Sequence, residues 1–134
     1  MNIIDEIRTR LNKYPDVKSE IGADYVRVAP NSEDGFSVEL DANHNEYTVH
    51  FNGWHETLAE QEEALNCFAF GLSTDCRLRE YSRSGLAYIW TVKYKDGDKW
   101  LEDGTISLLI YPHWGKKEIV VLQNKPISGG NGVV

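Results

Sequence analysis

The N-terminal segment carries a single apolar stripe with helical spacing. Its members recur at steps of three and four residues: Ile3, Ile4, Ile7, Leu11 and Tyr14. Asn2 precedes the stripe, and its side chain can accept a hydrogen bond from a backbone amide of the first turn. We therefore predict a long N-terminal helix that begins after Asn2. Because Pro15 disfavours helical backbone at the residue before it, the helix ends there or continues as a short second piece through Val17 and Ile21.

Alternation of apolar and polar residues replaces this pattern between residues 36 and 51. The apolar members are Phe36, Val38, Leu40, Tyr47, Val49 and Phe51. A period of two predicts strands that are covered on one face only. We predict an antiparallel hairpin with a four-residue loop at Ala42–Asn45, which places Leu40 opposite Tyr47. A shorter strand over Tyr25–Val28 precedes this hairpin.

A second helix is predicted from Thr57 onwards. Thr57 and Glu60 have the spacing of a capping box, in which each side chain accepts a hydrogen bond from the backbone amide of the other residue. The apolar residues that suit an inward face are Leu58, Leu65, Phe68, Ala69 and Leu72. Gly71 adopts left-handed backbone at low cost, so we expect the helix to end there.

The last third of the sequence predicts an antiparallel meander. Its strands cover residues 77–82, residues 86–94, a segment that ends near Ile110, and residues 119–122, with a turn over 112–115 before the last of them.

Two irregular positions are predicted within this meander. Asp96-Gly97 is a strong signal for a two-residue hairpin turn, which would set Val92 opposite Leu101. Leu101 and Ile106 are an odd number of positions apart, so they cannot share a face of a regular strand. We therefore expect a β-bulge at Asp103-Gly104 between them.

These elements predict the α+β class, in the order α-β-β-β-α-β-β-β-β. The chain has 134 residues, of which 41% are hydrophobic, so it can bury a core without a metal ion or a disulfide bond. We expect a single domain over residues 1–125, with a predominantly antiparallel sheet of about six to seven strands and both helices packed on one face. The glycine-rich residues 126–134 are expected to form a flexible tail.

Charge is distributed unevenly along the sequence. The net charge is −7, which argues against a nucleic-acid-binding protein because such proteins need a basic face. Residues 28–76 contain ten acids and no Lys or Arg. Glu39, Asp41 and Glu46 lie on the polar side of the predicted hairpin and are candidates for docking a basic partner. The alternative is that these acids face water and serve solubility alone.

The cysteines and histidines predict neither a metal site nor a catalytic centre. Cys67 and Cys76 match no zinc or redox spacing, and we expect both thiols to be buried and inert in a reducing compartment. His50, His55 and Glu56 offer zinc-ligand types, but the histidine pair lacks the spacing of ligands on a helix. The sequence contains no phosphate-binding, nucleophile-elbow or metalloprotease motif. We expect no catalytic residue, no bound metal and no cofactor.

The most distinctive segment links the predicted hairpin to the predicted second helix. Its candidates for a ligand loop are His50, Trp54, His55 and Glu56. A structural alternative is that Trp54 packs the end of the strand against the helix. Trp100 and Trp114 are predicted at the ends of hairpins, where they either anchor a partner or cap the core.

The sequence supports two hypotheses about function. The first is a non-enzymatic protein-interaction module, for example an immunity-protein-like or chaperone-like chain that binds a basic partner. The second is a small-ligand-binding or enzyme-like domain with a pocket between helix and sheet, lined by Tyr88, Trp90, Trp54, His50 and His55. Because the sequence lacks a membrane-spanning apolar run and the pattern of a secretory signal, we expect a cytoplasmic location without membrane or nucleic-acid partners.

Overall fold

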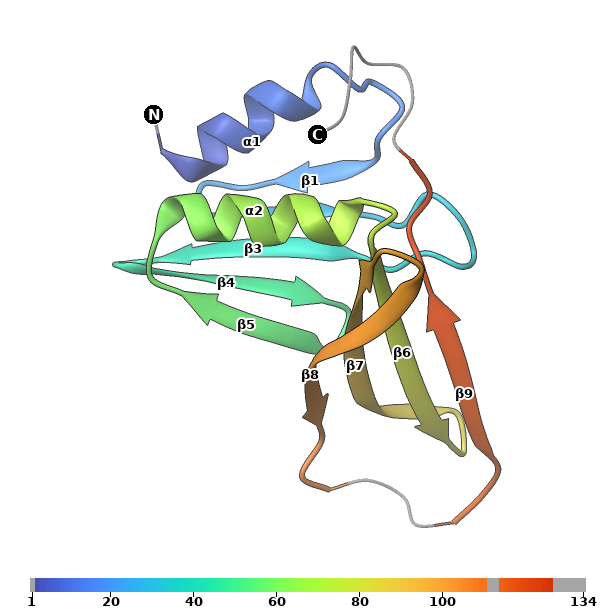
Figure 1. Ribbon diagram of the computed structural model, residues 1–134. Coiled ribbons are helices and arrows are strands. Elements are labelled where there is room, and N and C mark those ends of the chain that lie inside the picture. Colours follow the sequence, from blue (N-terminus) through green and yellow to red (C-terminus); the bar gives the residue numbers. More distant parts are fainter. Residues whose placement is uncertain (1, 111–113, 127–134) are drawn as a thin grey trace.

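The computed structural model describes residues 2–110 and 114–126, which form two helices and two antiparallel sheets (Figure 1). The helices are α1 (Ile3–Leu11) and α2 (Gln61–Leu72). The five-stranded sheet contains, in spatial order, β1 (Ser19–Ile21), β2 (Tyr25–Val28), β3 (Val38–Asn43), β4 (Glu46–Phe51) and β5 (Trp54–Leu58). The four-stranded sheet contains, in spatial order, β8 (Lys99–Ser107), β7 (Leu86–Asp96), β6 (Cys76–Arg83) and β9 (Lys117–Leu122).

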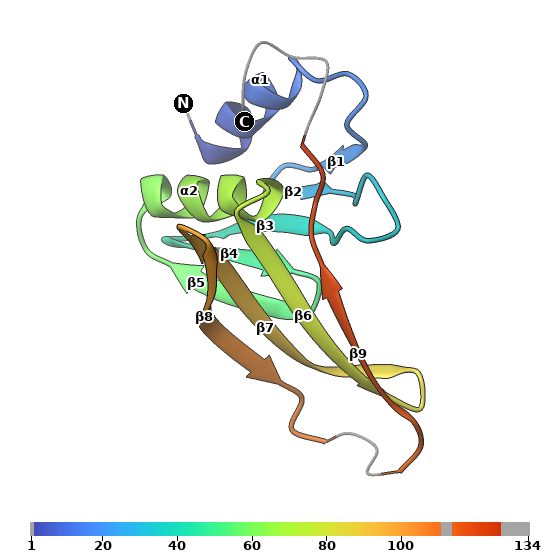
Figure 2. The same cartoon turned by 45° about the vertical axis from the view of Figure 1, so that its right-hand side comes forward.

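Helix α2 lies across one face of the five-stranded sheet, above β3 and β4, and α1 lies above α2 (Figures 1 and 2). The four-stranded sheet contacts α2 through β6 and contacts β5 through β7 and β8. Its other end extends beyond the five-stranded sheet (Figure 1). The main core therefore lies where α2 and the inner faces of both sheets meet, and it includes Phe51, Phe68, Leu78 and Val92.

Helix α1 confirms the apolar stripe and the cap at Asn2. All four of its stripe residues are buried: Ile3, Ile4, Ile7 and Leu11. The Asn2 side chain accepts a hydrogen bond from the Asp5 amide at 2.9 Å. The helix has nine residues, so it is short rather than long. The helical continuation predicted through Val17 and Ile21 is wrong, because residues 19–21 pair with β2 as strand β1.

The β3–β4 hairpin confirms the predicted strands and their apolar face, but not their register. Four apolar residues of the hairpin are fully buried: Val38, Leu40, Val49 and Phe51. The turn contains two residues rather than four, so Leu40 pairs with Val49 and not with Tyr47. A shift of two positions leaves the same side chains on the inner face, and the alternation alone therefore cannot distinguish the two registers.

The capping box predicted at Thr57 is wrong. Thr57 lies in β5, where its hydroxyl is 3.1 Å from the hydroxyl of Thr48 on β4. Helix α2 begins at Gln61, and Glu60 at its N-cap position makes no capping hydrogen bond through its side chain. Asn52-Gly53 forms a two-residue turn that joins β4 to β5. Residues 57 and 58, which were expected to start the helix, instead pair with β4, and this pairing satisfies their backbone groups.

Gly71 does not end α2, which continues through Leu72. The ring of Phe51 lies against the backbone of Gly71, and a β-carbon at this position would overlap that ring. The glycine therefore permits close approach of helix and sheet rather than a left-handed stop. The predicted inward face is confirmed at Phe68 and Leu72, which are buried.

The β7–β8 hairpin confirms a two-residue turn, displaced by one residue from the prediction. The turn residues are Gly97 and Asp98 rather than Asp96 and Gly97. Gly97 has a φ of 63°, a left-handed conformation that glycine adopts without steric cost. Leu101 consequently pairs with Tyr94 and not with the predicted partner.

The β-bulge predicted at residues 103–104 is confirmed. Val92 pairs with Gly104, whereas the next residue, Lys93, pairs with Glu102. Asp103 is therefore the extra residue, and it brings Ile106 to the inner face, opposite Trp90.

The α+β class and the antiparallel pairing are confirmed, but a single sheet with the helices on one face is wrong. The observed order is α-β-β-β-β-β-α-β-β-β-β, with β1 and β5 added to the prediction. Neither helix in the described part of the chain is long and apolar enough to cross a membrane. Residues 112–113 of the predicted turn and residues 127–134 of the predicted tail lie outside the described residues, and the single domain over 1–125 stays a prediction.

Candidate functional site

The outer face of the five-stranded sheet, which points away from α2, carries a polar row across neighbouring strands. Strand pairing places Glu39 of β3 between Arg27 of β2 and His50 of β4. His50 in turn lies opposite His55 of β5. Asp41 follows Glu39 by two positions, so it shares this face. The β2–β5 registers therefore hold five chemically active side chains on one rigid surface.

Glu39, Asp41 and His50 form the outer-face cluster. Nε2 of His50 lies 2.9 Å from Oδ2 of Asp41. One donor atom from each of the three residues lies within 4.8 Å of the other two, and all three residues are half-buried. The ring centre of His55 is 5.8 Å from that of His50. The structure thus brings together residues that the sequence assigned separately to partner docking and to a ligand loop.

Burial and a neighbouring carboxyl group both disfavour the charged form of Glu39. Burial raises the pKa of Glu39, and the adjacent Asp41 acts in the same direction through hydrogen bonding and through its negative charge. His50 and Arg27 lower the pKa of Glu39, but not enough to offset these effects. The cluster therefore holds negative charge at some cost in free energy, and a cation placed between the donors would relieve that cost.

The other candidates from the same hairpins lie elsewhere. Glu46 shares the outer face but lies at the exposed end of the hairpin. Trp54 points to the opposite face, where it is buried and stacks on Phe51 with ring centres 4.8 Å apart. Glu56 also lies on the side of Trp54, so it is separated from His55. The segment from Trp54 to Glu56 is a strand and not a loop.

Trp100 and Trp114, predicted at hairpin ends, have different surroundings. Trp100 is half-buried, and the guanidinium of Arg77 lies 3.9 Å from the centre of its ring. Trp114 is 72% exposed, although its carbonyl accepts a hydrogen bond from the Ser84 hydroxyl at 2.9 Å. Trp114 is therefore the exposed tryptophan that suits an interface, while Trp100 is covered by a cation.

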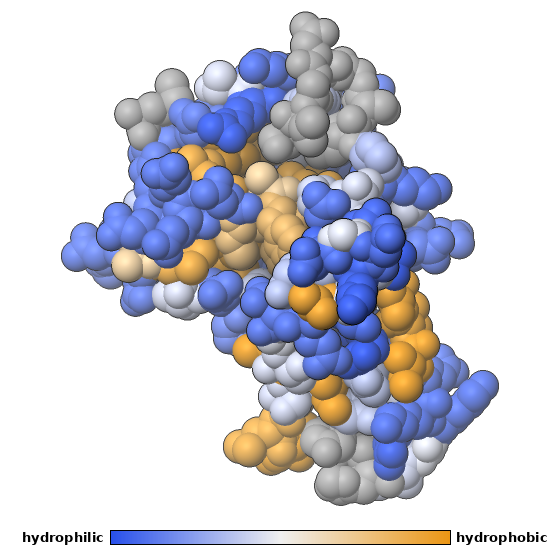
Figure 3. Space-filling model, viewed as in Figure 1, coloured by the Kyte–Doolittle hydropathy of each residue, from blue (hydrophilic) through white to orange (hydrophobic). Residues whose placement is uncertain are grey.

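A second surface was not recognised from the sequence. Large apolar side chains are exposed after β8 and along β9, and we define them as the distal apolar surface: Leu108, Leu109, Ile110, Trp114, Ile119, Val120 and Val121. In the space-filling view, hydrophobic atoms gather along the right-hand border and at the lower end of the extending sheet (Figure 3). The sequence signal was the apolar run 119–122, but only Leu122 in this run is buried.

The face of the four-stranded sheet that points away from the core is basic. Strand pairing places these cations on it: Arg77, Arg79, Arg83, Lys93 and Lys117. Glu102 is an acid on the same face, and its carboxylate accepts a hydrogen bond from Arg79 at 2.6 Å. The basic face of the four-stranded sheet and the polar row that holds Glu39 and Asp41 therefore belong to different sheets.

The pocket expected between helix and sheet is not formed by the residues predicted for it. His50 and His55 lie on the outer face, whereas Trp54 and Trp90 are buried in the core. Trp90 donates a hydrogen bond from Nε1 to the carboxylate of Glu80 at 2.9 Å. These side chains therefore cannot line one cavity.

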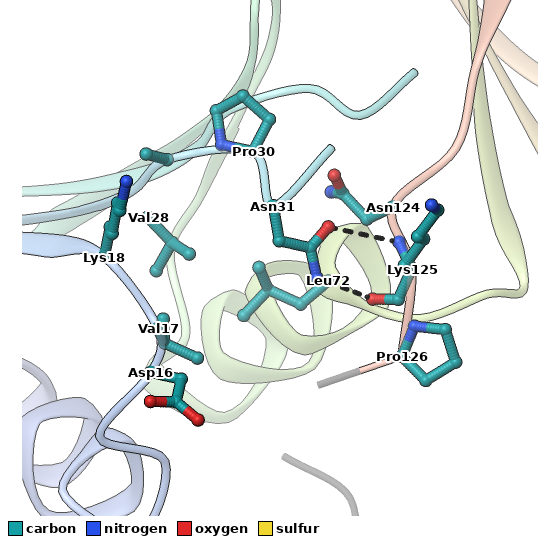
Figure 4. A pocket seen from close by; sticks show the side chains of 11 residues that line it. Asp16, Val17, Lys18, Val28, Pro30, Asn31, Leu72, Asn124, Lys125 and Pro126 are labelled. Carbon is teal, nitrogen blue, oxygen red and sulfur yellow. Dashed lines mark hydrogen bonds between the residues drawn. The ribbon is translucent and has the colours of Figure 1, made fainter. Parts of the chain in front are cut away.

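A cavity of about 240 Å³ lies at the C-terminal end of α2 instead (Figure 4). Asp16, Lys18, Asn31 and Lys125 supply polar groups to its lining. The Asn31 side chain and the backbone of Lys125 bond to each other at 3.3 and 3.4 Å. The cavity is smaller than the roughly 300–1,000 Å³ of small-molecule sites, and part of its polar lining is already satisfied, so we assign it no ligand.

The two thiols are expected to be unreactive in the folded protein. Burial, followed by the charges of Glu56 and Asp103, raises the pKa of Cys67 to about 12. Burial also raises the pKa of Cys76, which is fully buried at the start of β6. At pH 8, a thiol-specific disulfide reagent should therefore modify Cys67 about a thousandfold more slowly in the native chain than in urea, because the thiolate is the nucleophile.

The same pKa shifts give a stability change in alkali. A raised thiol pKa contributes stability that is fully present below the ordinary pKa of 9.0 and is lost as the pH rises through about 12. For the modification experiment, rapid reaction of either thiol in the native protein at pH 8 would contradict the raised pKa of Cys67 and Cys76.

Neither a family model, nor a curated protein, nor a solved structure matches this chain.

Proposed function

We propose that this chain is a non-enzymatic protein-interaction module whose partner docks on the distal apolar surface. The observation that carries the proposal is the exposure of these seven apolar side chains, which ranges from 38% for Leu108 to 95% for Leu109. A single exposed leucine needs no explanation, but this many exposed apolar side chains after β8 and along β9 are typical of an interaction surface. Trp114 supplies the aromatic side chain that most often anchors such an interface.

The free edge of β9 supports a specific mode of docking. Among the described residues, β9 pairs only with β6, so the backbone groups on its other side have no strand partner. The strand contains no proline, and Ile119, Val120 and Val121 are about half exposed. An extended partner segment laid beside β9 would satisfy the open backbone groups and cover these side chains.

The charges beside β9 indicate the chemistry of that segment. Lys117 of β9 pairs with Arg83 of β6, and Val121 pairs with Arg79, so cations follow the outer face next to the free edge. We therefore propose a partner strand that is apolar and acidic. Docking of a basic partner on Glu39, Asp41 and Glu46 stays a prediction for the opposite, acidic surface.

The test uses the full chain as an affinity bait, followed by binding measurements with the purified partner. Two variants remove apolar surface: Trp114→Ala and the double variant Ile119→Thr/Val121→Thr. Threonine is β-branched like isoleucine and valine, so the double variant keeps side chains that suit a strand. Each should weaken binding by roughly tenfold or more, the usual loss for an interface hot spot. Leu101→Thr is the matched control, since Leu101 is 37% exposed on β8 outside the proposed surface, and it should leave the Kd unchanged.

Three outcomes would contradict the proposal. One is a partner that binds both distal variants as tightly as the unaltered chain. Another is a basic partner that is lost with Glu46→Lys rather than with Trp114→Ala, which would place docking on the acidic surface. The third is concentration-dependent self-association that the distal variants abolish, with no other protein bound, because a second copy would then be the occupant.

A further inference from the structure

We propose that Glu39, Asp41 and His50 bind a divalent transition-metal ion, and that Zn²⁺ fits this donor set best. This site is independent of the docking surface on β9. One imidazole nitrogen and two carboxylates are a common set of protein ligands for zinc. A site built only from carboxylates would favour calcium or magnesium, and His50 shifts the preference toward transition metals.

The fold presents these three donors on the central strands of a sheet rather than on a loop. Glu39 and His50 are directly opposed partners in the β3–β4 pairing, and Asp41 lies two positions further along the same face. Strands β3 and β4 are flanked by β2 and β5, so their backbone is held on both sides. The site therefore depends only on side-chain rotamers, and its backbone is organised in advance.

The distances are compatible with one ion after a small contraction. The donor atoms lie within 4.8 Å of one another, and His50 Nε2 lies 2.9 Å from Asp41 Oδ2. Ligands of a tetrahedral zinc ion are roughly 3.4 Å apart, because the metal–ligand bonds are about 2.1 Å long. The widest pair must therefore close by somewhat more than ~1 Å, which rotation about the Glu39 side-chain bonds can provide.

The charges around the site favour a cation. Two carboxyl groups lie side by side on a half-buried surface, and the neighbouring cation is Arg27 on β2. A divalent ion would replace the hydrogen bond between His50 and Asp41 with two metal bonds. The ring centre of His55 lies 5.8 Å from that of His50, so a water molecule or His55 would supply the fourth ligand.

The experiment titrates the EDTA-treated full chain with ZnCl₂ by isothermal calorimetry and with Co²⁺ by visible absorption. We expect one ion per chain, with a Kd of about 10 μM or tighter, and cobalt bands of four- or five-coordinate intensity. His50→Ala and Asp41→Asn should each weaken Zn²⁺ binding by roughly tenfold or more. His44→Ala is the matched control, because His44 is exposed in the turn of the same hairpin, and it should bind like the unaltered chain.

The free energy of unfolding in EDTA shows whether each variant folds. If Asp41→Asn fails to fold, Glu39→Gln replaces it with the same expected loss of Zn²⁺ binding. The proposal is overturned if the unaltered chain binds Zn²⁺ only above about 100 μM, or if His50→Ala retains binding. It is also overturned if His44→Ala loses as much affinity as His50→Ala, or if Ca²⁺ binds more tightly than Zn²⁺.

Discussion

Replacement of Phe51 by alanine is expected to lower the free energy of unfolding by about 3–5 kcal/mol. Phe51 is fully buried at the end of β4, where the two sheets and α2 meet. Its ring stacks on Trp54 at 4.8 Å and contacts Phe36 at 5.5 Å and Phe70 at 6.4 Å. The backbone of Gly71 closes the remaining side of the ring. Truncation would leave a cavity bounded by β5, α2 and the segment before β3, which cannot all move into it.

Urea denaturation followed by tryptophan fluorescence measures this loss. Phe51→Leu should lose less than half as much stability, because it retains most of the buried volume. Leu86→Ala is the surface control, since Leu86 is 46% exposed, and its effect should stay within about 0.5 kcal/mol. A Phe51→Ala variant as stable as this control would contradict the packing described for the core.

Replacement of Asn124 by alanine is expected to cost about 2–5 kcal/mol, because it leaves two buried backbone groups without partners. Asn124 follows β9 and is 5% exposed. Its Oδ1 accepts a hydrogen bond from the Phe36 amide at 3.0 Å, and its Nδ2 donates one to the Gly71 carbonyl at 2.9 Å. One side chain thus joins the chain after the four-stranded sheet to the segment before β3 and to the last turn of α2.

Denaturation of two further variants separates this role from a general effect of asparagine loss. Asn124→Asp keeps the acceptor for Phe36 but places a carboxylate oxygen against the Gly71 carbonyl, so it should be at least as destabilising as alanine. Asn31→Ala removes an exposed side chain that bonds to the backbone of Lys125, and it should cost less than about 0.5 kcal/mol. Equal stability of the Asn124→Ala and Asn31→Ala variants would contradict the proposed role of Asn124.

The elements that the sequence predicted correctly are those in which burial follows a local period. The stripe of α1 and the alternation of β3 and β4 report directly which side chains face the core. The β-bulge was predictable because Leu101 and Ile106 are an odd number of positions apart, so both can face the core only if an extra residue lies between them, whatever the register.

Strand β5 was missed because two local signals competed for the same residues. Thr57 and Glu60 have the spacing of a capping box, but Asn52-Gly53 is a preferred dipeptide of two-residue hairpin turns. The hairpin wins in the structure because Trp54 stacks on Phe51 in the core and the β4–β5 pairing satisfies the backbone. A stack between rings of two different strands has no signature in a local pattern.

The outer-face cluster could not be predicted for a related reason. The predicted four-residue loop placed Ser37 opposite His50, whereas the observed two-residue turn places Glu39 there. Both registers bury the same apolar residues, so hydrophobic patterning carries no information on which carboxylate meets the histidine.

The distal apolar surface shows that a local pattern can predict a strand without predicting whether that strand is covered. The apolar run in β9 predicts a strand, and the strand exists, but β9 is an edge strand of a sheet that extends beyond the five-stranded sheet. Whether an apolar side chain is covered depends on elements that are distant in the sequence. An exposed edge strand and a buried strand therefore have the same local pattern.

Hydrogen exchange at β9 tests the central claim, docking of a partner on its free edge, most directly. In the free chain, the β9 amides that point away from β6 should exchange rapidly, because no described strand pairs with them. In the complex with the purified partner, these amides should become protected by at least roughly tenfold, while the exposed hairpin end at His44 is unchanged. Protection confined to β3 and β4, with no change in β9, would contradict docking on the distal apolar surface.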